Sequence, residues 1–318
     1  MPKFLTTTTG LWPKIGGKAP SLRANLHKFD RREIAAEELE LVIQKNIERA
    51  VREQLARGID LPTDGLIRAN DLFAPFVEIW AGLTRRGIHR FLDTNTLYGE
   101  PVVTDELKFK PSRLGTDFAC AQKFGAKKAL LPGPFTFAQA CVNKFYPNSR
   151  ELEHAIARNL QREIAALKKA GAEFIELHEP SLALEQFPAE RIKAIVQVLE
   201  PAGEIIFVSY FRNFSLETAQ AILAGGGVLG LDLTAPLNFA LSALPPNLAR
   251  IQLGVINMRE TRLETVADLP QDLWRDLKIP EVLLSTNASA EFLPHDRALA
   301  KVHLLQDLRV KLSGDEEK

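Results

Sequence analysis

The chain has 318 residues, of which 46% are hydrophobic and 25% are charged. This composition is typical of a globular protein, and the length suits one large α/β barrel. Because 40 Lys and Arg residues balance 40 Asp and Glu residues, no global basic field favours nucleic acid or an anionic membrane as a partner. No apolar run is long enough to span a bilayer, and Cys120 and Cys141 form no CxxC pair. We therefore expect a cytoplasmic protein with no nucleic-acid or membrane partner.

Long helical patterns alternate with short apolar runs along the chain. The helical patterns cover 35–58, 149–171 and 295–312, and Gly58 and Gly171 end the first two. The apolar runs lack the alternation of a half-exposed strand, which favours parallel strands that are buried on both faces. They cover 5–10, 59–65, 129–133, 174–180, 205–211, 228–234, 251–257 and 282–288. We therefore predict a single (β/α)8 TIM barrel over residues 1–312, a β-hairpin inserted near 90–109, and a disordered tail over 313–318.

Polar side chains follow several of these predicted strands, where barrel enzymes hold their catalytic groups. His178 and Glu179 end one strand just before Pro180, and they could act as general acid and base or form a hydrogen-bonded rim. Asp232 ends another strand. Asp64 and Arg68 could hold a zwitterionic substrate together with a neighbouring aspartate, or they could form a local ion pair at a helix start.

Two further groups of polar residues are candidates for ligand binding. Asp93 and Asn95 could hydrogen-bond a planar ligand, or they could form a turn that needs no ligand. The basic residues near the start of the chain could bind an acidic tail or a phosphate, or they could form a solvated surface. These residues are Lys14, Lys18, Arg23, Lys28, Arg31 and Arg32.

The sequence contains no pattern of metal ligands. Zinc needs three or four converging Cys, His or carboxylate side chains, and the six histidines include no HxH, HxC or HExxH pair. Neither cysteine ends a predicted strand, and no GxSxG, P-loop or GxGxxG motif is present. We therefore predict no protein-bound metal and no tightly bound cofactor.

Several stretches resemble the cobalamin-independent methionine synthases, in family order over nearly the whole chain. They are "TTTTGLWPKIG", "FLDTNTLYGEP", "LLPGPFTFAQA", "ELHEPSLAL", "SYF", "GLDL" and "LGVINMR". In that family two related barrels share one polypeptide, and the C-terminal barrel holds a catalytic zinc. That barrel transfers a methyl group from methyltetrahydrofolate polyglutamate to the thiolate of homocysteine. Three of the stretches, "FLDTNTLYGEP", "SYF" and "GLDL…LGVINMR", look more similar to the N-terminal barrel, which lacks zinc.

The chain departs from the family at the zinc positions. The resemblance aligns Phe207 and Ser209 with the histidine and cysteine ligands, Asp232 with the glutamate ligand, and Ala288 with the last cysteine. Phenylalanine cannot bind a metal ion, and serine ionises far less readily than cysteine. The acids that hold the homocysteine amine are also changed, because the family's "TDGE" ends here in Leu66 and its "DEP" begins here with His178.

The resemblance therefore implies a methionine-synthase-type protein of methionine biosynthesis, similar to the zinc-less N-terminal barrel but on a chain of its own. Such a barrel would bind the folate tail through Lys14, Lys18 and Arg23, and it would support a separate zinc-bearing C-terminal-type barrel. Zinc is then expected only on that partner chain.

Two alternatives stay open. One is a methyltransferase that acts alone on another thiol acceptor or with another metal site, with His178, Glu179 and Asp232 as its catalytic residues. The other is a non-catalytic barrel that binds a small ligand.

Overall fold

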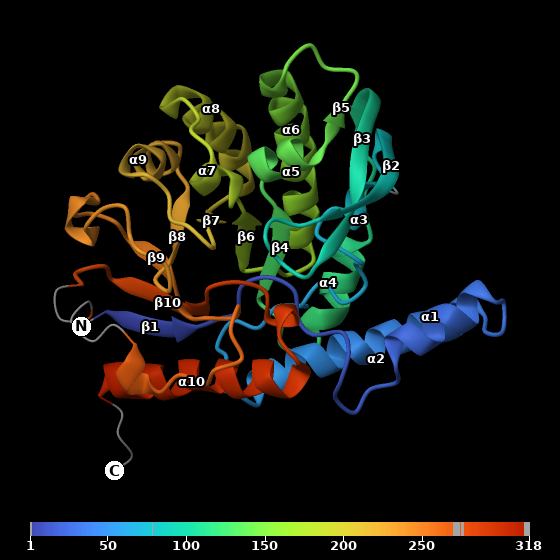
Figure 1. Ribbon diagram of the computed structural model, residues 1–318, viewed down its shortest axis with the longest axis horizontal. Coiled ribbons are helices and arrows are strands. Elements are labelled where there is room, and N and C mark those ends of the chain that lie inside the picture. Colours follow the sequence, from blue (N-terminus) through green and yellow to red (C-terminus); the bar gives the residue numbers. More distant parts are fainter. Residues whose placement is uncertain (1, 78, 270–273, 275–276, 315–318) are drawn as a thin grey trace.

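A curled parallel sheet forms the centre of the molecule (Figure 1). The computed structural model describes residues 2–77, 79–269, 274 and 277–314. The sheet has seven strands in the order β1-β10-β9-β8-β7-β6-β4. They are β1 (Lys3–Thr6), β4 (Lys128–Pro132), β6 (Phe174–His178), β7 (Ile205–Val208), β8 (Val228–Asp232), β9 (Arg250–Ile256) and β10 (Glu281–Thr286).

The two edges of this sheet are joined by segment 61–63. One isolated parallel bridge connects Thr7 to Leu61, and another connects Thr63 to Lys128. Segment 61–63 therefore lies between β1 and β4 and takes the place of the eighth strand. Each of the eight predicted strand ranges contributes to this arrangement, so the prediction of a (β/α)8 barrel is confirmed.

Helices surround the sheet on its outer side (Figure 1). They are α1 (Leu22–Asp30), α2 (Ala36–Leu55), α3 (Ala74–Val77), α4 (Leu114–Gln122), α5 (Pro134–Ala140), α6 (Ser149–Lys169), α7 (Ser181–Leu184), α8 (Ala189–Leu199), α9 (Leu216–Ala224) and α10 (His295–Ser313). Short 3-10 helices cover 200–202, 241–243, 266–268 and 290–292. Within the described ranges, no helix combines the length and the apolar character needed to cross a bilayer.

Helix α6 shows how the sequence builds this outer layer. The side chain of Asn148 accepts a hydrogen bond from the Glu151 N–H and so caps the first turn. Apolar residues at helical spacing, among them Ile156, Leu160 and Ile164, are fully buried, while the opposite face is charged and exposed. The helix ends before Gly171, whose φ of 101° suits a residue without a Cβ. The predicted range 149–171 therefore matches the helix closely.

Strands β2 (Ala81–Arg90) and β3 (Leu97–Lys108) pair antiparallel beside the barrel, and β5 (Val142–Asn143) joins β3 to complete a small second sheet. The range predicted for the hairpin, 90–109, covers only the turn and the second strand. The first strand lies earlier in "AGLTRRGIHR", where charged residues are exposed along most of its length. Such a strand lacks the apolar pattern on which the sequence prediction depends.

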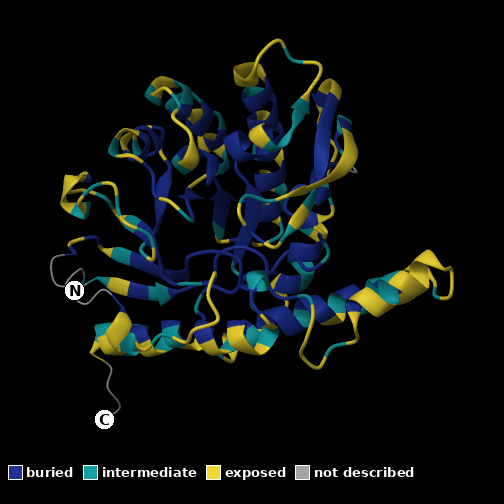
Figure 2. Cartoon of the chain, viewed as in Figure 1, coloured by how far each residue is buried: buried dark blue, intermediate teal, exposed yellow. Residues whose placement is uncertain are grey.

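The N-terminal helices form an arm that extends away from the barrel. Helix α1 buries only Leu22, and its tip is exposed on nearly every side (Figure 2). Helix α10 packs alongside β1 near the C-terminus (Figure 1). Ser313, the first residue of the predicted disordered tail, is the last residue of α10, and residues 315–318 lie outside the described residues.

Candidate functional site

A charged network fills the interior of the barrel below His178. Lys128 of β4 donates to Glu176 of β6 over 2.5 Å, and Gln252 of β9 donates to the same carboxylate oxygen, Oε2, over 2.7 Å. The other oxygen, Oε1, lies 2.9 Å from Nε2 of His178. Lys128 and Glu176 are completely buried, and His178 is 1% exposed. Residues of β4, β6 and β9, which meet in the barrel interior, therefore hold the His178 ring at the carboxyl end of the sheet.

Opposite effects act on the pKa of Glu176. Burial raises it, but the positive charge of Lys128 and the hydrogen bond with His178 outweigh burial and lower the pKa to about 2. The carboxylate is thus ionised at neutral pH. Because a buried carboxylate is stable only with partners, Lys128 and His178 cannot move away from it without a large penalty.

A cavity of about 160 Å³, here called the mouth cavity, lies above this network. Its aromatic walls are Phe73, Phe91, Tyr98, Tyr210 and Phe292. Its polar lining comprises Asn70, Asp71, Thr96, His178, Ser289 and Glu291. A concave site with aromatic walls and a few polar groups is the usual form of a small-molecule site.

Two polar atoms in the mouth cavity have no hydrogen-bond partner among the residues that the structure describes. His178 and Tyr210 are each at least 97% buried, and their rings meet edge to face with centroids 5.5 Å apart. Within the described part of the chain, no residue hydrogen-bonds the Tyr210 hydroxyl or Nδ1 of His178. Burial raises the pKa of Tyr210 well above its usual value, so the hydroxyl keeps its proton. A bound molecule could therefore accept a hydrogen bond from Tyr210 and interact with His178.

Glu179, the neighbour of His178, faces away from this cavity and caps helix α5. Its Oε1 accepts from the Phe135 N–H at 2.9 Å, and its Oε2 accepts from the N–H and the hydroxyl of Thr136 at 2.8 and 2.9 Å. Gly133 makes room for the carboxyl group, since a Cβ at that position would lie 2.1 Å from Glu179 Cδ. Burial raises the pKa of Glu179 to about 8. The carboxyl group therefore joins β6 to α5 and does not line the mouth cavity.

The carboxylate of Asp232 is also fully engaged. Oδ1 accepts from the N–H and the hydroxyl of Thr234 at 2.9 and 2.6 Å. Oδ2 accepts from the Phe211 N–H at 3.0 Å and from Asn287 at 3.2 Å. Burial raises the pKa of this group. His178 and Glu179 thus lie at the end of β6 and Asp232 at the end of β8, with β7 between them, and of the three only His178 lines the mouth cavity.

The four positions that the resemblance aligns with zinc ligands lie in the barrel interior or at its strand ends. Phe207 and Ala288 are completely buried and have no ligand atom, and Ser209 is 1% exposed. Asp232 would have to lose its hydrogen bonds to become a ligand. Among all residues that the structure describes, no group of three or more His, Cys, Asp or Glu side chains could hold a metal ion. The four aligned positions therefore do not fit zinc.

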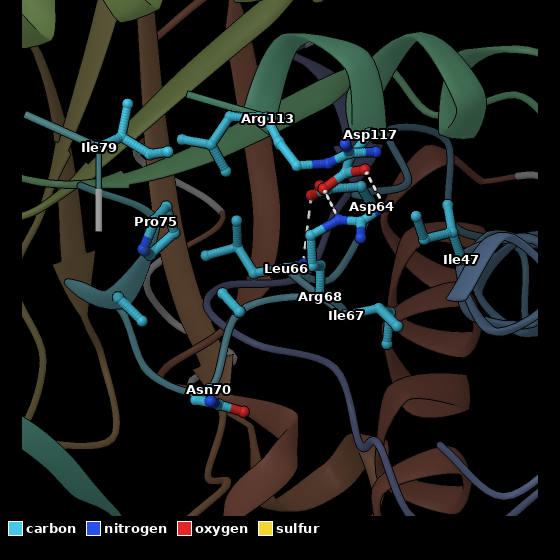
Figure 3. Close-up of a pocket in the computed structure, with 13 residues that line it drawn as sticks. Ile47, Asp64, Leu66, Ile67, Arg68, Asn70, Pro75, Ile79, Arg113 and Asp117 are labelled. Carbon is cyan, nitrogen blue, oxygen red and sulfur yellow. Dashed lines mark hydrogen bonds and ion pairs between the residues drawn. The ribbon is translucent and has the colours of Figure 1, made fainter. Parts of the chain in front are cut away.

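Asp64 and Arg68 lie in a different cavity, here called the side cavity, between the barrel and helices α2 and α4 (Figure 3). Arg68 binds Asp117 through two hydrogen bonds of 2.7 and 2.8 Å, and it also binds Glu40. Asp64 lies beside this cluster and is 4% exposed. Asn70 lines both cavities, so the segment from Asp64 to Asn70 separates them.

The other sequence candidates lie on the surface around the barrel mouth. Asp93 and Asn95 are exposed in the turn between β2 and β3, and Arg259 approaches Asp93 to 4.0 Å. Lys14 reaches the rim of the mouth cavity, where its Nζ lies 3.7 Å from Glu291. Lys18 and Arg23 are exposed further along the arm.

Tyr210, Glu291 and Phe292 line the mouth cavity but are not among the candidates named from the sequence. Tyr210 lies two residues after the end of β7, and this place at the carboxyl end of a strand is a usable signal. Glu291 and Phe292 belong to a short 3-10 helix after β10, and no strand or helix pattern marks that position. Only the folded barrel brings these two residues into the same cavity lining as His178.

Comparison with known proteins identifies the family. A family model described as the catalytic domain of cobalamin-independent synthase matches residues 4–208. Methionine synthase of Saccharolobus solfataricus is 28% identical over 293 residues, which cover 87% of this chain and 84% of that protein. The corresponding protein of Sulfurisphaera tokodaii is 25% identical, with 95% and 90% covered. The fold is similar to that of a B12-independent methionine synthase from a Shewanella species in complex with selenomethionine, with a TM-score of 0.76, 17% identity and 98% of both chains covered. The chain therefore belongs to the family of cobalamin-independent methionine synthases.

Proposed function

We propose that this chain serves methionine synthesis as a barrel without zinc, which binds a substrate of the methyl transfer in its mouth cavity and works with a zinc-bearing barrel on another chain. One observation carries the proposal. The four positions aligned with the zinc ligands hold Phe207, Ser209, Asp232 and Ala288, which do not fit a metal ion, whereas a built cavity remains beside them.

The mouth cavity suits the folate better than homocysteine. The two acids that hold the homocysteine amine in the resembling enzymes are replaced by Leu66 and His178, so that anchor for an ammonium group is lost. The walls offer five Phe and Tyr rings, which favour stacking or edge contact with a planar heterocycle. Tyr210 can donate a hydrogen bond to a ring carbonyl or nitrogen, and His178 is held rigidly beside it by Glu176.

The geometry gives less support to a methyltransferase that acts alone. Such an enzyme would need Glu179 and Asp232 to bind or activate the substrate, together with His178. Instead, both oxygens of each carboxyl group accept hydrogen bonds from backbone or side-chain donors of the protein. Of these three residues only His178 lines the mouth cavity, and its Nδ1 has no hydrogen-bond partner among the described residues.

Calorimetric titration of the purified chain with methyltetrahydrofolate triglutamate, and separately with homocysteine, tests the proposal. We expect the folate to bind, and homocysteine to bind at least about tenfold more weakly. His178→Ala and Tyr210→Phe should each weaken folate binding several-fold, because each removes an unpaired polar atom from the cavity. His303→Ala is a matched control, since that histidine is exposed on α10. Unchanged folate binding by both cavity variants would contradict the proposed site.

A further inference from the structure

The side cavity is a second, partly open space of about 110 Å³. Most of its wall is apolar, and Ile47, Leu66, Ile79 and Leu114 contribute to it. For comparison, an apolar cavity of roughly 150 Å³ is large enough to hold benzene. The side cavity is smaller than this, so it suits a branched chain or a ring of about four or five carbon atoms. Figure 3 shows Asp64, Arg68, Arg113 and Asp117 gathered together, with Pro75 and Ile79 on the opposite side of the cavity.

The charges around the polar end nearly cancel. Arg68 binds Asp117 and Glu40, and Arg113 from the start of α4 binds Glu40 over 3.0 Å. Two guanidinium groups thus face two carboxylates, and the Arg68 fork is occupied on both sides. The Arg68 guanidinium already binds two carboxylates and is not available to a bound anion. The Asp117 and Glu40 carboxylates would also repel an anion.

Asp64 is the exception among these charged groups. It is 4% exposed, and the hydrogen bond that the described residues donate to its side chain is a long one of 3.3 Å from the Leu66 N–H to Oδ1. Burial raises the pKa of Asp64 to about 7, and the nearby Asp117 carboxylate acts in the same direction. Among the described residues no cationic side chain pairs with Asp64, so the side cavity presents a buried carboxyl group that lacks such a partner.

We propose that the side cavity binds a small organic cation, in which an ammonium or amidinium group donates to Asp64 and an apolar body of about five heavy atoms fills the space against Ile47, Ile79 and Leu114. The cation supplies the partner that Asp64 lacks, and its body displaces water from apolar walls. This site is distinct from the mouth cavity, and the inference does not depend on the proposed function. The segment that carries Asp64 does, however, form the wall between the two cavities.

Binding should depend on pH, because Asp64 must be ionised to pair with a cation. The charged groups that face it are Asp117 and Arg113 on α4, Glu40 on α2 and Arg68 on its own segment. With a pKa of about 7, Asp64 is mostly ionised at pH 8 and mostly protonated at pH 6. The affinity for a permanent cation should therefore fall about tenfold between pH 8 and pH 6.

Cyclopentylammonium is a suitable probe, and cyclopentanol is its neutral counterpart of similar size. We expect calorimetry on the full chain at pH 8 to give at least about tenfold tighter binding of the ammonium, and Asp64→Asn to remove this preference. Asp307→Asn, a change at an exposed aspartate on α10, should leave it intact. Ile79→Phe should block both probes by filling the cavity while Asp64 remains. Equal binding of the two probes by the unchanged protein, or an undiminished preference in Asp64→Asn, would overturn the inference.

Discussion

Nε2 of His178 lies 2.9 Å from one carboxylate oxygen of Glu176, and the other oxygen is 2.5 Å from Nζ of Lys128. The side chain that faces the mouth cavity is thus fixed by an ion pair at the centre of the barrel. Both members of that pair are completely buried. Breaking it should therefore affect the whole fold as well as the position of His178.

Replacing Lys128 by Met removes the cation and leaves the Glu176 carboxylate in the core with one charged partner fewer. We expect a loss of about 3–5 kcal/mol in the free energy of unfolding, measured by urea denaturation at pH 7. The double variant Lys128→Met with Glu176→Gln should lose less, because it buries no unpaired charge. Lys123→Met, at an exposed position on the outer layer, serves as a control. A loss below about 1 kcal/mol for Lys128→Met would show that the pair is not essential to the core.

Glu179 should be important for stability and not for binding in the mouth cavity. Glu179→Ala leaves the N–H groups of Phe135 and Thr136 buried without an acceptor, which costs about 1–3 kcal/mol for each such group. Glu179→Gln keeps one carbonyl oxygen in place and should lose less. Thermal unfolding and folate titration of both variants test this assignment. Weaker folate binding by a variant that remains as stable as the unchanged protein would instead favour a direct role in the site.

The pKa of Asp64 predicts how stability depends on pH. Its usual pKa is 3.8, and burial raises the folded-state value to about 7. Between these values the folded chain holds a proton that the unfolded chain has released, so stability falls as the pH rises from about 4 to 7. Asp64→Asn carries no such proton. The free energy of unfolding of Asp64→Asn, relative to that of the unchanged protein, should rise across that interval by up to about 4 kcal/mol. Urea denaturation at several pH values measures this difference, and a constant difference would contradict the shift.

Lys18 and Arg23 should contribute to binding the acidic tail of a folate polyglutamate. Both are exposed, so each ion pair is worth less than about 1 kcal/mol and is screened by salt. The double variant Lys18→Ala with Arg23→Ala should reduce the preference for triglutamate over monoglutamate roughly fivefold at low salt. Lys278→Ala, an exposed change outside the arm, should not alter it. If the double variant keeps the full preference, the tail binds elsewhere.

The barrel could be predicted from the sequence because its strands are buried on both faces and its helices carry one apolar face. Residues such as Ile175 and Leu177 therefore mark β6 without any knowledge of its neighbours. The hairpin was placed less well, since the exposed β2 gives no such pattern.

The partners of the site residues could not be predicted in this way. Glu176 is a single acid within an apolar run, and Lys128 lies far from it in sequence. Only the pairing of β4 with β6 brings the two side chains together. In the same way, Arg68 was expected to act with the aspartates near it in sequence, but its partners Glu40 and Asp117 come from α2 and α4. Local patterns reveal which element a residue belongs to, whereas the partners depend on how those elements pack.

Methionine formation from homocysteine and methyltetrahydrofolate triglutamate, with zinc supplied, tests the central proposal most directly. The assay compares the purified chain alone, a zinc-bearing catalytic barrel of the same family alone, and the two together. We predict no turnover by the chain alone, because its strand ends do not fit zinc, and faster turnover by the mixture than by the zinc barrel alone. Turnover by the chain alone, or a zinc barrel that gains nothing from its addition, would contradict the proposal.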